Sequence, residues 1–173
     1  MRNVFILGAG ASRRAGGPLM ADFLESAAQL LRQRVEGVTN AQQSFDDVFN
    51  AIVELQTVHA KSYLDLDNIE ILFGAIEMAQ VVGKLGKRSE DEISTLRKSI
   101  VTLIFTTLEY SIKFTVRKGQ VYPPDPYQQF VDMLKNKVEN RSPFDPHSYS
   151  ILTFNYDMAL DFALYNSMIP FDY

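Results

Sequence analysis

The sequence predicts an α/β fold in which a parallel sheet carries a large helical insertion. Three observations lead to this prediction. A short apolar run lies near each end of the chain, at Val4–Leu7 and at Tyr149–Phe154. Each run is followed by a glycine-rich or polar turn and then by a helix-like segment, which is typical of strands in a parallel sheet. The chain between the two runs shows helical periodicity almost throughout.

The first strand leads directly into a glycine-rich turn. Val4–Leu7 is continuously apolar and partly β-branched, which favours a strand that is buried on both faces of a sheet. The segment Gly8–Ser12, with the sequence GAGAS, interrupts this run. Pro18 then stands where a helix can begin. Apolar residues at helical spacing predict that one helix continues over residues 19–35.

Four further helices are predicted between the two strands. They cover residues 44–58 with Ser44 as the cap, residues 66–82, residues 89–116 and residues 128–139. In the third of them, a serine and a glutamate three residues apart have the spacing of a capping box. Its middle is apolar nearly all round, so we expect this helix at the centre of the helical layer.

The second strand is followed by one more helix, over residues 157–168, with Asp157 as its cap. The turn-rich segment YPPDPY, residues 122–127, is expected to be a stiff loop. Two strands cannot form a stable open sheet. We therefore expect residues 1–173 to be the N-terminal part of one longer domain, with the helical insertion at about residues 40–140.

Composition narrows the classes of function. The formal net charge is −4, and no basic run exceeds two residues, which disfavours a dedicated nucleic-acid binder. The chain has no cysteine, so it holds no disulfide, thiol nucleophile or cysteine-ligated zinc. This composition is compatible with a reducing cytoplasm. No apolar run approaches the roughly 20 residues of a membrane helix, so we expect no membrane partner.

Two motifs follow the predicted strands. The glycine turn can bring backbone N–H groups close to a phosphate, although the full G-x-G-x-x-G pattern fails because Arg13 holds the third position. The second motif is TFNYD, in which Asn155 and Asp157 follow the second strand. Ligands of parallel sheets bind at the carboxyl ends of the strands, so Ser12 and these two residues are expected at one sheet edge. A tight turn without a ligand, and simple turn or capping roles for Asn155 and Asp157, are the structural alternatives.

The order of these motifs resembles a known family. GAGAS after a strand, then Gly17-Pro18, a helical stretch and TFNYD after another strand resemble the sirtuin-like NAD-binding domains. More closely, it looks like the NAD-hydrolysing sirtuin-like effectors of bacterial anti-phage defence. The resemblance implies a Rossmann-like parallel sheet, incomplete in this chain, and a cytoplasmic NAD hydrolase that cleaves the nicotinamide–ribose bond. It also implies a homo-oligomer, or a fused or partner sensor domain.

The resemblance carries roles over to individual residues. It implies that Asn155 holds the nicotinamide ribose or the attacking water and that Asp157 helps to fix the nicotinamide end. Asp22 and Phe23 fall where deacylating sirtuins carry a PDFR-like segment, although the string here is GGPLMADFL. The zinc module of those enzymes uses four cysteines, so NAD cleavage is favoured over deacylation and no metal is expected. The implied cofactor-binding residues are Gly8, Ala9, Gly10, Ala11, Ser12, Asp22, Phe23 and Thr153.

The histidines do not match the catalytic histidine that the family places after the second motif. His59 and His147 both precede that motif, and His147 is expected at the opposite sheet edge. We interpret both as structural or surface residues and expect the catalytic histidine beyond Tyr173. Two other functions stay open. One is a non-catalytic regulatory module that binds NAD or ADP-ribose, and the other is a truncated remnant that only associates with a partner.

Overall fold

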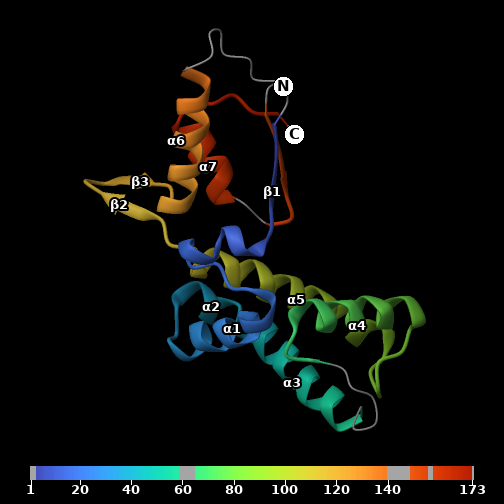
Figure 1. Cartoon of the computed structure of the whole chain (residues 1–173). Coiled ribbons are helices and arrows are strands. Elements are labelled where there is room, and N and C mark those ends of the chain that lie inside the picture. Colours follow the sequence, from blue (N-terminus) through green and yellow to red (C-terminus); the bar gives the residue numbers. More distant parts are fainter. Residues whose placement is uncertain (1–2, 59–64, 140–148, 156–157, 173) are drawn as a thin grey trace. The chain divides into compact units, whose positions relative to one another are not determined.

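The computed structural model describes residues 3–58, 65–139, 149–155 and 158–172. The chain is mixed α/β and mostly helical. It divides into two compact units, which are described separately (Figure 1). The sheet unit comprises Met1–Gly17 and Ile112–Tyr173, and the helical unit comprises Pro18–Ser111. The predicted insertion at about residues 40–140 stays a prediction.

The sheet unit contains the two predicted strands as a parallel pair. Strand β1 (Asn3–Leu7) and strand β4 (Tyr149–Thr153) lie side by side (Figure 1). Their register pairs the first residues of the two strands, and it also pairs Leu7 with Thr153 at the carboxyl ends. The prediction of a parallel sheet formed by these two runs is confirmed.

The two faces of this sheet differ in burial. One face packs against helix α6 (Asp125–Glu139) and helix α7 (Met158–Asn166), and the ring of Phe5 meets that of Phe130 edge to face at 5.2 Å. On the other face Ile6 is 67% exposed, and Val4 and Leu152 are exposed as well. The expectation of strands buried on both faces is therefore wrong for the described residues. A continuous apolar run does not reveal which face the helices cover.

The helical unit is built around one long helix. It contains α1 (Phe23–Arg32), α2 (Glu36–Asn40), α3 (Gln42–Val58), α4 (Ile69–Val82) and α5 (Glu90–Ser111). Helix α5 contacts each of the other four. Ile100 and Leu103 of α5 are fully buried in the core of this unit. The prediction that this helix lies at the centre of the helical layer is confirmed.

Local side-chain chemistry explains where α4 and α5 begin. Asn68 caps α4 by accepting the Glu70 N–H at 2.9 Å. At α5, Glu92 accepts hydrogen bonds from the backbone N–H of Ser89 at 2.7 Å and from its hydroxyl at 2.9 Å. The Glu92 N–H in turn points to the Ser89 hydroxyl oxygen at 3.4 Å. The predicted capping box of α5 is therefore confirmed.

The predicted helix over residues 19–35 is interrupted. A short 3₁₀ turn precedes α1, and α1 itself ends at Arg32. Arg34 follows with a φ of 53°, a left-handed conformation that cannot continue a helix.

Helix α2 was not predicted. Ser44 is not a cap, because its N–H donates to the Ala41 carbonyl inside the first turn of α3.

A hairpin replaces the end of the helix predicted over residues 89–116. Helix α5 stops at Ser111, and strands β2 (Thr115–Arg117) and β3 (Gln120–Tyr122) form an antiparallel pair. Lys118 and Gly119 turn the hairpin with φ values of 50° and 75°. These are the two positive φ angles of a tight type I′ turn. Part of the expected loop YPPDPY is also helical, because α6 begins at Asp125.

Candidate functional site

The carboxyl ends of β1 and β4 bring the two sequence motifs together. Leu7 pairs with Thr153, and the Phe154 N–H donates to the Leu7 carbonyl at 3.0 Å. The chain then leaves β1 as the glycine turn, Gly8–Ser12, and leaves β4 toward Asn155. Because the strands are parallel neighbours, both turns lie at the same edge of the sheet, which is where ligands of parallel sheets bind.

Asn155 bridges the two turns. Its side-chain Nδ2 donates to the Gly8 carbonyl at 2.7 Å, across 147 residues of sequence. Its backbone N–H donates to the hydroxyl oxygen of Thr153 at 3.2 Å. The first bond uses the NH₂ group of the amide and does not involve Oδ1. That oxygen can accept a hydrogen bond from a ligand hydroxyl or a water.

The glycine turn is a single 3₁₀ turn over Ala9–Ala11. Its hydrogen bonds run from the Ala11 N–H to the Gly8 carbonyl at 2.9 Å and from the Ser12 N–H to the Ala9 carbonyl at 3.3 Å, so the turn itself does not use the amides of Ala9 and Gly10. Gly8 has an extended backbone, with a φ of −103°. A Cβ added at Gly8 or at Gly10 would meet no heavy atom within 4 Å. Neither glycine is therefore required by packing among the described residues, and the space beside both is open.

Ser12 closes the turn from inside. It is buried, and its hydroxyl donates to the Ala9 carbonyl at 3.0 Å. Its carbonyl accepts the N–H groups of Ala15 and Gly17. A Cβ at Gly17 would stand 2.8 Å from the Ser12 side chain, so that glycine is fixed by packing. The structure thus gives Ser12 a role in holding the shape of the turn.

Two arginines beside the turn were not assigned a role from the sequence. Arg13 and Arg14 follow Ser12 directly and are exposed. Residues 3–17 contain no aspartate or glutamate, although the whole chain is acidic. Arg14 therefore brings a positive charge next to the turn, and positive charge attracts anions such as phosphates. The signal in the sequence is an arginine pair placed just after a Gly-x-Gly turn.

Asp22 and Phe23 belong to the helical unit and have structural contacts there. The Asp22 carboxylate accepts the Leu19 N–H at 2.6 Å, and the Asp22 carbonyl accepts the Ser26 hydroxyl at 2.9 Å. Phe23 is only 2% exposed, in the core of that unit. Their predicted contacts with a dinucleotide stay predictions.

Other residues of interest lie outside the described ranges. These are Asp157, His59 and His147, and the roles predicted for them stay untested. Among the described residues no group of three histidine, aspartate or glutamate side chains is placed to hold a metal ion. No helix in the described part of the chain combines the length and the apolar character that spanning a membrane needs.

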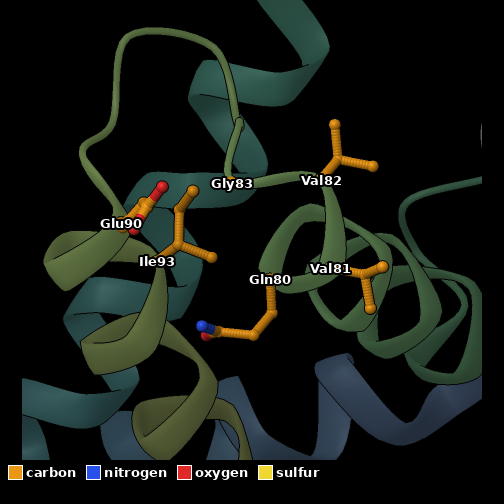
Figure 2. A pocket seen from close by; sticks show the side chains of 6 residues that line it. All are labelled: Gln80, Val81, Val82, Gly83, Glu90 and Ile93. Atoms are coloured by element: carbon orange, nitrogen blue, oxygen red, sulfur yellow. The ribbon is translucent and has the colours of Figure 1, made fainter.

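A hollow of about 160 Å³ lies in the helical unit, whereas the glycine turn belongs to the sheet unit. It is formed where α4 ends and α5 begins (Figure 2). Figure 2 shows the Gln80 side chain extended toward the α5 side, whereas Val81 and Val82 point away from it. Its lining residues are Gln80, Val81, Val82, Gly83, Glu90 and Ile93.

Comparison with known proteins identified no relative of this chain. A scan against protein-family models, a search of curated proteins and a search of solved structures each found no match.

Proposed function

We propose that this chain carries the nucleotide-binding part of an NAD hydrolase that acts as an effector in bacterial defence against phage. The observation that supports the proposal is the 2.7 Å hydrogen bond from Asn155 Nδ2 to the Gly8 carbonyl. It joins the two motifs on which the resemblance to sirtuin-like domains depends. We propose further that the β1–β4 pair belongs to a Rossmann-like sheet in a cytoplasmic protein.

The glycine turn is the proposed binding site of the dinucleotide phosphates. Open space beside Gly8 and Gly10 lets a ligand approach the backbone, which a Cβ at either position would hinder. The amides of Ala9 and Gly10 are not used by the turn and can donate to phosphate oxygens. Positive charge from the exposed Arg14 favours the same anionic ligand.

Asn155 is the proposed catalytic residue at the nicotinamide ribose. Its NH₂ group is held by the Gly8 carbonyl, which leaves Oδ1 to accept a hydrogen bond from a ribose hydroxyl or from the attacking water. Orientation of this kind lowers the barrier because the reacting groups no longer need to be ordered in the transition state.

The proposed reaction needs NAD⁺ and water only. The bond between the nicotinamide nitrogen and the ribose C1′ breaks, and its electron pair leaves with nicotinamide. The ribose passes through a transition state that resembles an oxocarbenium ion, as in glycoside cleavage. Water then adds at C1′ and loses one proton, so the products are ADP-ribose, nicotinamide and H⁺.

Substitution of the glycine turn tests the proposal. Gly10→Val places a branched side chain in the open space where the phosphates are expected, while no described neighbour is contacted by its Cβ. We expect NAD affinity, measured by calorimetric titration, to fall at least about tenfold, which is ~1.4 kcal/mol of binding free energy. Thermal unfolding should be close to that of the wild type. Unchanged affinity in a stable variant, or no NAD binding by the wild type, contradicts the proposal.

Turnover separates the hydrolase from the regulatory alternative. Nicotinamide and ADP-ribose released from NAD are measured by chromatography on the longest natural form of the protein. Release of both products at equal rates supports hydrolysis. NAD or ADP-ribose binding without release contradicts the hydrolase and supports a non-catalytic regulatory module at the same glycine turn.

A further inference from the structure

Helix α4 is apolar on two opposite sides. One side enters the core of the helical unit through Ile69, Leu72, Ile76 and Ala79. The opposite side is exposed to solvent, with Met78 at 62% and Val81 at 84% exposure. With 3.6 residues per turn these exposed residues fall on one face of the helix. We call this face the α4 outer stripe, which consists of Ile71, Gly74, Met78, Val81 and Val82.

Nothing in the described part of the chain explains Gly74. It lies in the middle of α4, where glycine destabilises a helix by about 0.5–1 kcal/mol relative to alanine. A Cβ at this position would meet no heavy atom of the described residues within 4 Å. By contrast, Gly83 ends the helix with a φ of 70° and is needed for that conformation. A helical glycine that no described neighbour requires, within an exposed apolar stripe, indicates that another surface approaches the helix closely.

We propose that the α4 outer stripe binds the same stripe of a second copy of this chain, with the two helices antiparallel. A twofold axis near Ile76 places Met78 of each copy over Gly74 of the other. The same axis places Ile71 opposite Val81. A twofold interface requires this kind of self-complementary pairing, in which each residue meets its counterpart in both copies.

The charges at the two ends of α4 fit the antiparallel arrangement. Glu70 is exposed at the first turn and Lys84 is exposed just beyond the last turn. Antiparallel pairing brings Glu70 of each copy toward Lys84 of the other, whereas parallel pairing brings like charges together. The hollow beside Val81 and Val82 lies at the end of the stripe that meets Ile71 of the other copy. One helix pair is a small interface, so we expect a reversible dimer.

Sedimentation velocity of the longest natural form of the protein over a wide concentration range tests this dimer. We expect a monomer–dimer equilibrium in the wild type. Met78→Glu places a charge in the centre of the stripe and should raise the dissociation constant at least about tenfold, because a charge buried without a partner is costly. Val116→Glu is the matched control, since Val116 is 65% exposed on β2. A wild type that stays monomeric, or equal effects of both variants, overturns the proposal.

Two further variants separate dimerisation from folding. Gly74→Ala should raise the melting temperature of the dilute monomer, because alanine favours the helix, and yet weaken the dimer, because its methyl group separates the two helices. Glu70→Lys and Lys84→Glu should each weaken the dimer, and the double reversal should restore it. The proposal is overturned if Gly74→Ala raises both the melting temperature and the dimer affinity, or lowers both. It is also overturned if the double reversal does not restore the dimer. This inference does not depend on the ligand of the glycine turn.

Discussion

Individual residues at the sheet edge have structural as well as proposed chemical roles. The Asn155 side chain is a hydrogen-bond donor to the Gly8 carbonyl, so it fixes the two turns to each other. Ser12 holds the glycine turn from its buried side. In contrast, Gly8 and Gly10 have open space beside them. Substitutions at these positions are therefore expected to differ in how much stability they cost.

Asn155→Ala should remove turnover and slightly lower stability. Loss of the bond to the Gly8 carbonyl is expected to cost about 1 kcal/mol, the usual net value of one neutral hydrogen bond. Loss of Oδ1 removes the proposed contact with ribose or water, so nicotinamide release should become undetectable. Product chromatography beside a chemical denaturation curve measures both effects.

The matched control for this variant is Asn166→Ala, which removes an exposed amide at the end of α7. The control should keep wild-type turnover and stability. If Asn155→Ala retained most of the wild-type turnover, Asn155 would not be the catalytic residue.

At the scale of elements, local and long-range causes can be told apart. The start of α5 is determined locally by Ser89 and Glu92, three residues apart, and the sequence predicted it correctly. The hairpin β2–β3 was not predicted, because its apolar residues continue the helical stripe of α5 without a clear break. The turn at Lys118-Gly119 was the available signal.

The capping box of α5 should make stability depend on pH in the acid range. Hydrogen bonds from the Ser89 N–H and hydroxyl, with the nearby Arg88 charge, hold the pKa of Glu92 below its ordinary value. A lowered folded pKa stabilises the native state above the unfolded pKa, and this stabilisation is lost as pH falls through the folded pKa. Glu92→Gln should therefore show a smaller loss of stability between neutral and acid pH than the wild type.

Denaturation curves at a series of pH values measure this difference. Glu109→Gln, which changes an exposed carboxyl near the other end of α5, is the control and should follow the wild type. Equal pH dependence in wild type and Glu92→Gln would show that the capping box does not contribute to it.

At the scale of the whole molecule, the described residues form two hydrophobic clusters. One lies in the helical unit around α5, and the other lies between the β1–β4 sheet and helices α6 and α7. Leu103 is fully buried in the first cluster, and Leu134 is 3% exposed in the second. Each cluster thus offers a leucine of similar burial for the same test.

Leu103→Ala and Leu134→Ala should each destabilise mainly their own unit, by about 3 kcal/mol, because each leaves a cavity in a packed core. Hydrogen exchange followed by mass spectrometry is the measurement. We expect faster exchange in α3–α5 for the first variant and in α6 and α7 for the second. Uniform acceleration along the chain in both variants would show that the two clusters unfold as one.

The sequence by itself determined the features that depend on neighbours in the chain. The two strands, the helix α4 and the capping box of α5 each follow from residues a few positions apart, and the structure confirms them. The sequence also placed the two motifs at the ends of predicted parallel strands. Because such ends lie at one edge of a sheet, the two motifs were expected to meet there.

Only the tertiary structure decided which surfaces are covered and which atoms meet. The apolar run of β1 does not reveal that Phe5 packs against α6 while Ile6 is exposed, because both residues are equally apolar. No local sequence pattern predicts the hydrogen bond from Asn155 to the Gly8 carbonyl or the open space at Gly74. Burial and hydrogen bonding between distant residues depend on how elements pack, and packing is a property of the folded chain alone.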